Sequence, residues 1–308
     1  MDAELESFKR NINLSEFAAS RGYELDRRAS SRNSAVMRHP NGDKIIIARN
    51  EASGDWIYFS VRDDRDNGTI IDFLQSRDGG SLGRVRKALR PWLGSSRPVG
   101  VQLSAFVKDL LPVSRDRAGV ITAWERARVC AALPYLTSRG LGPDVLGLPR
   151  FTGCVRIDPR NNALFPHYDH TGLCGFEIKN HEFTGFAPGG VKGLWHSAAR
   201  STDHWLVLTE SAIDSLSFHV LHGGDGARYM STGGALNHHQ PVLLRGAMEK
   251  MPKDGVVILA FDLDDGGETL AEEVKALAPA GRKIRRMAPE VGMGKDWNEA
   301  LKHRLGLA

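Results

Sequence analysis

The sequence predicts an α/β protein, α+β overall, in which a C-terminal parallel sheet flanked by helices follows a small α+β region and an N-terminal β-rich region. From about residue 203, apolar runs such as HWLVLTE and VVILAFD alternate with helix-like segments, the pattern of a parallel sheet covered on both faces. Between residues 150 and 197, short strand candidates separated by turn formers predict an antiparallel sheet that includes GLWHS. Residues 35–61 hold three β-rich runs divided by PNGD and EASGD, which predicts a meander.

Breaks in this pattern divide the chain into four segments. A length of 308 residues is enough for two domains and a small additional module. We expect a β-rich module over residues 1–93, a linker rich in Ser, Pro, Gly and Val over 94–118, an α+β subdomain over 119–200 and a parallel-sheet domain over 201–308.

Composition and cysteine usage limit the cellular compartments in which the protein is expected. No apolar run approaches the roughly 18 residues that span a bilayer, and the N-terminus MDAELESFKR is charged where a signal peptide is apolar. Cys130, Cys154 and Cys174 are far apart and form no CxxC pair, which argues against a zinc ribbon, a redox motif or a disulfide framework. We predict a cytoplasmic protein with free thiols and no membrane partner.

The positive charge is concentrated in the front half of the chain. Residues 1–150 contain 24 Lys and Arg against 18 Asp and Glu, whereas residues 151–308 contain 17 against 19. A predicted helix, SLGRVRKALRPWL, carries four of the basic residues: Arg84, Arg86, Lys87 and Arg90. This distribution fits a polyanion-binding platform, although an ordinary solvated surface has the same composition.

Acidic side chains follow two strands of the predicted parallel sheet. Glu210 ends one strand, and Asp262 and Asp264 follow another, so all three should lie at the carboxyl edge where ligands collect. Asp262 and Asp264 are two residues apart on an extended segment and should point to the same side. Asp214 lies one helical turn beyond Glu210. Carboxylates about 4 Å apart repel by roughly 4 kcal/mol at an effective dielectric constant of about 20, so the cluster predicts bound Mg²⁺ or Mn²⁺.

An alternative explains aspartates after a strand without a metal. They are common turn formers and helix N-caps, which satisfy exposed backbone N–H groups. An isolated DxDDG motif favours that explanation. The strand-terminal Glu210, with Asp214 four residues later in the same alternating unit, favours a metal site.

The strand-terminal glutamate followed by a DxD motif after a later strand resembles the Toprim domain shared by DnaG-type primases, topoisomerases and some nucleases. TESAID and FDLDDGGETLAEE are similar to its two acidic motifs, MSTGGAL to the turn after its middle strand, and GKDWNEAL to a late KDxNE-type segment. The resemblance covers residues 203–301. It implies catalytic roles for Glu210, Asp262 and Asp264. It implies a metal ligand set of Glu210, Asp214, Asp262, Asp264 and Asp296, with Lys295 of GKDWNEAL contacting nucleotide or DNA.

Weaker similarity extends toward the N-terminus. YLTSRGL, NALFPHYDHTGLCGFEIKN and KGLWHS resemble segments ahead of the primase Toprim domain, which makes Lys179 and Lys192 candidate phosphate-binding residues. The first 75 residues resemble the primase zinc-binding module, with DNGTIIDFLQ in place of its GxxIDFL segment. The zinc ligands of that module are absent here except for His39, so we predict a zinc-free version.

The resemblance implies a primase-like nucleotidyltransferase of plasmid, phage or mobile-element type. Its expected substrates are single-stranded DNA and nucleoside triphosphates, and its expected cofactor is Mg²⁺ or Mn²⁺ without zinc. The sequence has no GxxxxGK[ST] loop, so a separate helicase or relaxase is an expected partner. A Toprim nuclease and a non-catalytic DNA-binding accessory remain alternatives, while no strand-linked Tyr motif supports a topoisomerase.

Overall fold

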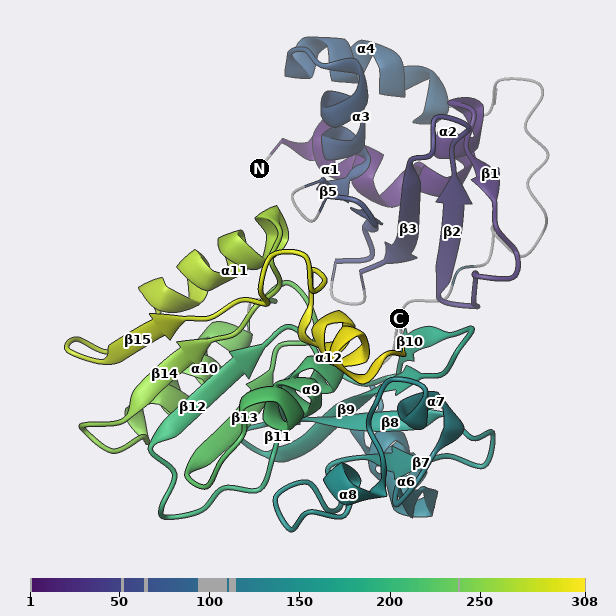
Figure 1. Cartoon of the computed structure of the whole chain (residues 1–308). Coiled ribbons are helices and arrows are strands. Elements are labelled where there is room, and N and C mark those ends of the chain that lie inside the picture. The colour runs from purple at the N-terminus through teal and green to yellow at the C-terminus, as the bar shows by residue number, and fades with distance from the viewer. Residues whose placement is uncertain are drawn as a thin grey trace. The chain divides into compact units, whose positions relative to one another are not determined.

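The computed structural model forms two compact units, Met1–Ser114 and Arg115–Ala308 (Figure 1). It describes residues 2–50, 53–63, 66–93, 110, 115–237 and 239–307. Most of the expected linker over residues 94–118 lies outside the described residues, and helix α6 already includes its end. Among the described helices, none is both long enough and apolar enough to cross a membrane.

The N-terminal unit packs four helices against an antiparallel sheet with strand order β1-β2-β3-β4-β5. The predicted meander over residues 35–61 is confirmed, because β2, β3 and β4 pair antiparallel in sequence order. The helices are α1 (Ala3–Asn11), α2 (Leu14–Ser20), α3 (Ile70–Asp78) and α4 (Leu82–Leu93). The strands are β1 (Glu24–Leu25), β2 (Ser34–Arg38), β3 (Lys44–Arg49), β4 (Trp56–Ser60) and β5 (Asn67–Thr69).

An arginine-centred network holds this unit together. Arg77 of α3 donates two hydrogen bonds to Asp66, at 3.0 and 2.8 Å, and one to Asp43 at 2.9 Å. It also donates to the hydroxyl of Tyr23 at 2.8 Å, and Tyr23 in turn donates to Asp43. Tyr58 donates to Asp66 at 2.5 Å. Helix α3 is thereby joined to the β2–β3 turn and to the segment between β4 and β5.

The C-terminal unit begins with helices around a second antiparallel sheet of order β10-β9-β8-β7-β6. Its helices are α6 (Arg117–Arg126), α7 (Pro134–Thr137) and α8 (Pro143–Leu146). Its strands are β6 (Arg128–Val129), β7 (Arg156–Ile157), β8 (Ala163–Asp169), β9 (Gly172–Lys179) and β10 (Thr184–Phe186). The antiparallel sheet predicted over residues 150–197 is therefore present.

One strand of that prediction was assigned to the wrong sheet. The segment GLWHS forms β11 (Trp195–His196), which pairs antiparallel with β13 of the third sheet. A single bridge from Tyr168 to Leu194 is its connection to β8. Trp195 is fully buried, and its indole N–H donates to the carbonyl of Cys154 at 2.8 Å, so packing from both sides fixes this edge strand.

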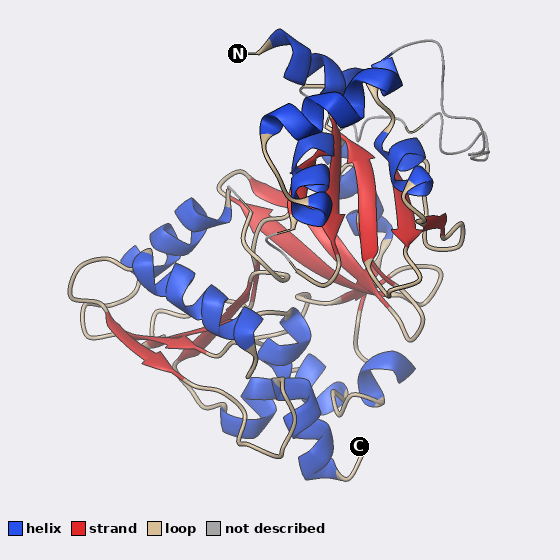
Figure 2. Cartoon of the chain, turned by 90° about the horizontal axis from the view of Figure 1, so that it is seen from above, coloured by secondary structure: helices blue, strands red, loops and turns tan. Residues whose placement is uncertain are grey.

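The third sheet has the order β11-β13-β12-β14-β15, and its last four strands are parallel, as the strand–helix alternation predicts. Its remaining strands are β12 (Trp205–Thr209), β13 (Ala227–Ser231), β14 (Val256–Leu259) and β15 (Lys283–Arg286). The helices are α9 (Ala212–His222), α10 (Gln240–Glu249), α11 (Asp265–Ala276) and α12 (Trp297–Leu305). Figure 1 labels these helices beside the strands of the sheet, and Figure 2 shows the chain from above with helices and strands in different colours.

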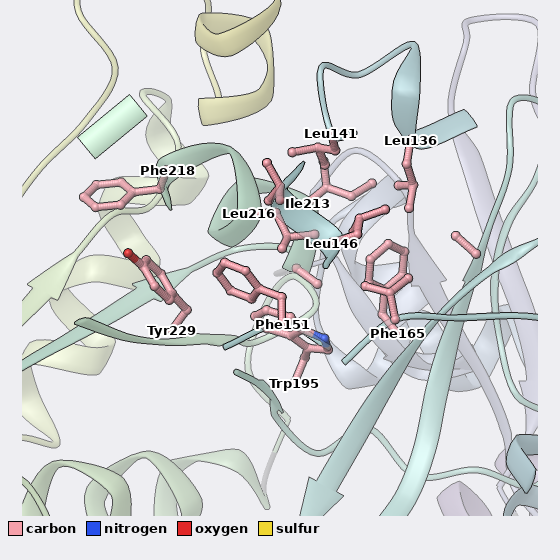
Figure 3. Close-up of a cluster of buried hydrophobic side chains, with 14 of the residues drawn as sticks. Leu136, Leu141, Leu146, Phe151, Phe165, Trp195, Ile213, Leu216, Phe218 and Tyr229 are labelled. Atoms are coloured by element: carbon pink, nitrogen blue, oxygen red, sulfur yellow. The ribbon is translucent and has the colours of Figure 1, made fainter. Parts of the chain in front are cut away.

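Each face of this sheet has its own hydrophobic core, because side chains alternate along a strand. Leu206 and Leu208 of β12 face the core that contains α10 and α11. Val207 faces the other core, which includes α9, α12 and side chains from the antiparallel region. Figure 3 shows this second cluster, where Phe165 and Trp195 lie near Phe151 and Ile213. The antiparallel region and the parallel sheet thus share one interior.

Candidate metal and phosphate site

Glu210 and Asp262 lie at the carboxyl edge of neighbouring parallel strands. Glu210 comes directly after β12, and Asp262 comes three residues after β14, which pairs with β12 in parallel. The backbone carbonyl of Glu210 accepts hydrogen bonds from Gly233 at 2.8 Å and Gly234 at 3.1 Å, both in the turn after β13. Three adjacent strands therefore fix the position of this edge, and the carboxyl group of Glu210 lies within hydrogen-bonding reach of Asp262.

Two helix N-termini bring further carboxylates to the same place. Asp214 is in the first turn of α9 and is almost completely buried. It accepts hydrogen bonds from the hydroxyl of Ser211 at 2.5 Å and from the backbone N–H of Asn298 at 3.2 Å. Asp296 is the N-cap of α12 and accepts from the backbone N–H of Glu299 at 2.7 Å. The contact between Asp214 and Asn298 joins the starts of the two helices.

The electrostatics of the cluster show that these carboxylates are close together. Burial is the largest cause that raises the pKa of the Asp262 carboxyl, which reaches about 9. The negative charges of Asp214, Glu210 and Asp296 raise it further, as does the hydrogen bond with Glu210. Burial and the charge of Asp296 raise the pKa of Asp214 to about 6. In the absence of a cation, the raised pKa of Asp262 therefore keeps a proton on this carboxyl at neutral pH, which an ordinary carboxyl group releases.

One buried oxygen in this cluster lacks a partner. Among the described residues, Oδ1 of Asp262 makes no hydrogen bond although it is buried. A buried acceptor without a partner costs about 1–3 kcal/mol, and a coordinated cation would remove that cost. Within the described ranges, no group of three or more His, Cys, Asp or Glu side chains lies close enough together to hold a metal ion. Mg²⁺ keeps several waters and is often bound through one or two carboxylates.

Asp264 and Lys295 lie at the rim of the cluster. Because β14 ends at Leu259, the chain has already left the strand at Asp262, and Asp264 is the exposed N-cap of α11. Its side chain accepts from the backbone N–H of Gly267 at 2.9 Å. Exposed Lys295 is held by its backbone, whose carbonyl accepts from the N–H of Leu263 at 2.7 Å. Asp264 thus has the N-cap role that sequence reasoning weighed as the alternative for these aspartates.

A buried chain of charges borders the acidic cluster. Lys179, at the end of β9, forms an ion pair with Glu177 at 2.7 Å. The other oxygen of Glu177 lies 3.1 Å from Nε2 of the fully buried His167, whose Nδ1 lies 2.8 Å from the carbonyl of Gly193. Both partners of the imidazole, the Glu177 carboxylate and the Gly193 carbonyl, are oxygen acceptors. Glu177 reduces the cost of burying the Lys179 ammonium, and the charge of Asp214 also stabilises it.

His167 and Glu177 were not predicted as site residues. Glu177 precedes Lys179 by two residues on the same strand, so the two side chains share one face. In the β8–β9 pairing, Glu177 is opposite Phe165, which places His167 diagonally across the ladder. The alternation in GFEIK was a signal that could have identified Glu177. The contribution of His167 depends on the register between two strands, which the sequence does not specify directly.

Lys192 stabilises the glycine turn next to the cluster. Its ammonium donates to the carbonyl of Gly233 at 3.2 Å and to that of Ala235 at 2.5 Å. Gly233 has a φ of +67°, and a Cβ there would lie 2.9 Å from Cε1 of His167. The turn therefore requires glycine, and Lys192 holds it between Glu210 and His167.

The four basic residues of α4 belong to the N-terminal unit. Arg86 forms ion pairs with Asp2 and, at 3.2 Å, with Glu4, while Arg90 pairs with Glu4 at 2.7 Å. The remaining two basic residues, Arg84 and Lys87, are exposed. Two of the four basic side chains predicted to bind nucleic acid are thus paired with carboxylates at the start of α1.

Two family models match the C-terminal unit, and one of them covers the parallel sheet with its acidic edge. Residues 207–301 match the family model described as Toprim-like, which confirms the resemblance seen in the sequence motifs. This part of the chain is a Toprim-like domain. Residues 134–203 match a second family model, described as a protein of unknown function (DUF3991). Among curated proteins, none matches the chain significantly.

Two solved structures are similar to part of the chain. The primase fragment of the bacteriophage T7 primase-helicase protein is 18% identical, with 58% of this chain and 73% of that chain covered and a TM-score of 0.40. The primase domains in a complex of the T7 lagging-strand DNA polymerase with an RNA/DNA hybrid and dTTP are 20% identical. That match covers 58% of this chain and 87% of the other, with a TM-score of 0.41.

Proposed function

We propose that the protein is a primase-like nucleotidyltransferase that synthesises short primers on single-stranded DNA with a divalent metal. The observation that carries the proposal is the half-buried Asp262 carboxyl, whose buried Oδ1 has no partner among the described residues and whose neighbours Glu210, Asp214 and Asp296 are also acidic. Repulsion within such a cluster is relieved by a cation. The Toprim-like family match over residues 207–301 supports the same assignment.

The metal-binding residues in this proposal are Glu210, Asp214, Asp262, Asp264 and Asp296. When bound, Mg²⁺ or Mn²⁺ would supply positive charge at the α-phosphate of the incoming nucleoside triphosphate, which the 3′-hydroxyl attacks and from which pyrophosphate leaves. The carboxylate of Glu210 accepts the proton of the attacking 3′-hydroxyl or acts as an additional ligand. Asp214 and Asp296, fixed at the starts of α9 and α12, orient the acidic edge.

Basic residues bind phosphate groups in the proposed complex. Lys179 is buried next to Asp214 and contributes a fixed positive charge, and Lys192 orders the glycine turn. Lys295 contacts nucleotide or DNA from the rim of the cluster. The N-terminal unit is proposed as a zinc-free nucleic-acid-binding module, whose α4 residues Arg84, Arg86, Lys87 and Arg90 contact the DNA backbone.

The setting of the reaction is also part of the proposal. We propose a plasmid, phage or mobile-element replication protein that acts in the cytoplasm, with a separate helicase or relaxase that exposes the single strand. The functional division is a nucleic-acid-binding module over residues 1–93, a linker over 94–118, a primase-like subdomain over 119–200 and a catalytic domain over 201–308.

Primer synthesis by Asp262→Asn tests this function. The substitution keeps the size of the side chain and removes the charge that a cation needs, so we expect at least a hundredfold loss of labelled products on single-stranded DNA with Mg²⁺ or Mn²⁺. Binding of single-stranded DNA should stay within about twofold, which a filter-binding assay measures. Asp225→Asn, at an exposed loop, is the matched control and should retain synthesis.

Other outcomes of this experiment would reject the assignment as a primase-like enzyme or its proposed site. Metal-dependent loss of the template without new products would indicate a Toprim nuclease that uses the same carboxylates. Tight DNA binding without any metal-dependent reaction would indicate a non-catalytic accessory. Unchanged synthesis by Asp262→Asn would reject the site itself.

A further inference from the structure

A polar pocket lies next to the acidic cluster in the C-terminal unit. It has a volume of about 450 Å³, and Asp296 and Asn298 at the start of α12 form part of its wall. The opposite side carries Ser138 and Arg139 from the segment after α7, and His181 from the β9–β10 turn. Lys302, one turn further along α12, also lines it. The pocket therefore combines basic and hydroxyl groups with a residue of the acidic cluster.

Reciprocal hydrogen bonds fix the basic side of the pocket to the acidic side. Arg139 donates from Nη1 to the side-chain carbonyl of Asn298 at 2.9 Å, and Asn298 donates from Nδ2 to the backbone carbonyl of Arg139 at 2.8 Å. The Arg139 guanidinium also lies over the ring of Tyr135, 4.9 Å from its centroid. His181 packs edge-on against the same ring at 5.3 Å. Because Asn298 also donates to Asp214, these contacts place Arg139 beside the cluster.

Two basic side chains of this pocket, Arg139 and Lys302, are not neutralised by an ion pair with any residue that the structure describes. Within the described residues, neither Arg139 nor Lys302 forms an ion pair with a carboxylate, although Asp296 and Glu299 line the same pocket. Lys179, in contrast, is bound to Glu177 at 2.7 Å. Glu299 is held by its own helix start, where it accepts from the backbone N–H of Lys295 at 2.8 Å. The guanidinium and ammonium groups therefore keep donors available for a ligand.

We propose that this pocket binds phosphate groups of the substrate next to the metal site. Arg139 and Lys302 donate to non-bridging phosphate oxygens, and His181 completes the donor set. The hydroxyl of Ser138, in contrast, already donates to the carbonyl of Tyr135 at 2.9 Å. A polyphosphate held there reaches the Asp296 side of the acidic cluster, where its remaining charge meets the cation. The inference rests on the proposed function for that cation. It adds a site for the substrate that lies outside the carboxylate cluster.

Binding measurements with Lys302→Gln test the pocket independently of catalysis. The probes are ATP, inorganic tripolyphosphate and a short oligodeoxythymidylate, each titrated with Mg²⁺ by calorimetry. We expect Lys302→Gln and His181→Ala each to weaken ATP and tripolyphosphate binding about five- to tenfold, the loss of one charge-assisted contact. Arg304→Gln, an exposed basic residue of the same helix that does not line the pocket, should change binding less than twofold.

The three probes distinguish two possible sources of the bound phosphate, the nucleoside triphosphate and the nucleic-acid backbone. Weaker binding of ATP and tripolyphosphate with unchanged oligonucleotide binding assigns the pocket to the nucleotide triphosphate. Weaker oligonucleotide binding alone assigns it to the backbone of the DNA or the primer. Unchanged binding of all probes in both variants, or no binding of any probe by the wild-type protein, would overturn the inference.

Failure of the pocket and failure of the proposed function give different results. If the wild-type protein synthesises primers and Lys302→Gln binds every probe normally, the pocket is rejected and the function stands. If Lys302→Gln weakens binding but the wild-type protein synthesises nothing, the pocket stands and the nucleotidyltransferase assignment is rejected. Thermal unfolding of Lys302→Gln within about 2 °C of wild type would show that its fold is intact.

Discussion

At the scale of single residues, Asp262 is the group on which the account depends. Its carboxyl is surrounded by Glu210, Asp214 and Asp296, and burial with these charges raises its pKa to about 9. The unfolded chain has an ordinary carboxyl pKa of about 4. Asp262 therefore holds a proton in the metal-free folded protein at a pH where the unfolded chain has released it.

The sign of the resulting pH dependence follows from proton linkage. Between about pH 4 and about pH 9 the folded state binds more protons than the unfolded state, so the free energy of unfolding falls as pH rises. The stabilising contribution of Asp262 is complete below about pH 4. We expect metal-free wild-type protein to be less stable at pH 8 than at pH 5, with Asp214, whose pKa is raised to about 6, adding to the effect.

Asp262→Asn removes this titration without a change in size. In EDTA, the midpoint temperature of the variant relative to wild type should rise from pH 5 to pH 8, by about 2–4 °C for each kcal/mol of relieved repulsion. Mg²⁺ at pH 8 should stabilise wild type and leave the variant nearly unchanged. Parallel melting curves for the two proteins at every pH, with and without Mg²⁺, would refute the assigned neighbours of Asp262.

At the scale of elements, the sequence specified the strands better than the contacts between them. The placement of Glu210 and Asp262 just beyond two parallel strands follows from apolar runs whose length is visible in the sequence, although β14 ends three residues before Asp262. The pairing of β11 with β13 was missed, because two-residue strands contain too few positions for a period to show. His167 was missed for a similar reason, since its contact with Glu177 depends on the register of β8 and β9.

In the N-terminal unit, a substitution in helix α3 tests the role of the Arg77 network. Arg77 binds Asp43 and Asp66 at once and stacks over Phe73, with its guanidinium 4.3 Å from the ring centroid. Arg77→Lys keeps the charge but loses the planar donor fork, and incomplete pairing of such a partly buried cluster costs about 3 kcal/mol. We expect hydrogen exchange of the amides in residues 70–78 to accelerate at least about tenfold.

A matched substitution separates this network from an ordinary ion pair. Arg10→Lys alters a pair with Asp55 in which the arginine side chain is 55% exposed. Exposed pairs contribute about 0.2–1 kcal/mol, so exchange in residues 70–78 should stay near the wild-type rate. Equal exchange rates in Arg77→Lys and Arg10→Lys would contradict the central role assigned to Arg77.

At the scale of the whole molecule, the chain combines a Toprim-like domain with two regions that the acidic motifs do not describe. Residues 134–203 share a hydrophobic core with the parallel sheet and supply Lys179 and Arg139 to its acidic edge. The fold class and the acidic edge were predictable, because both depend on short sequence patterns of apolar runs followed by acidic residues. The pocket between Arg139 and Lys302 was not, because it is formed by segments about 160 residues apart.

The most direct test of the account is an Mn²⁺ titration followed by electron paramagnetic resonance. The acidic edge predicts saturable Mn²⁺ binding that Mg²⁺ competes away, a weakening of at least about tenfold in Asp262→Asn, and unchanged affinity in the exposed control Asp225→Asn. Tenfold is about 1.4 kcal/mol, less than the loss expected for one carboxylate ligand. Mn²⁺ affinity that is the same in wild type and Asp262→Asn, or no saturable binding in wild type, would contradict the claim that this edge of the sheet is a metal site.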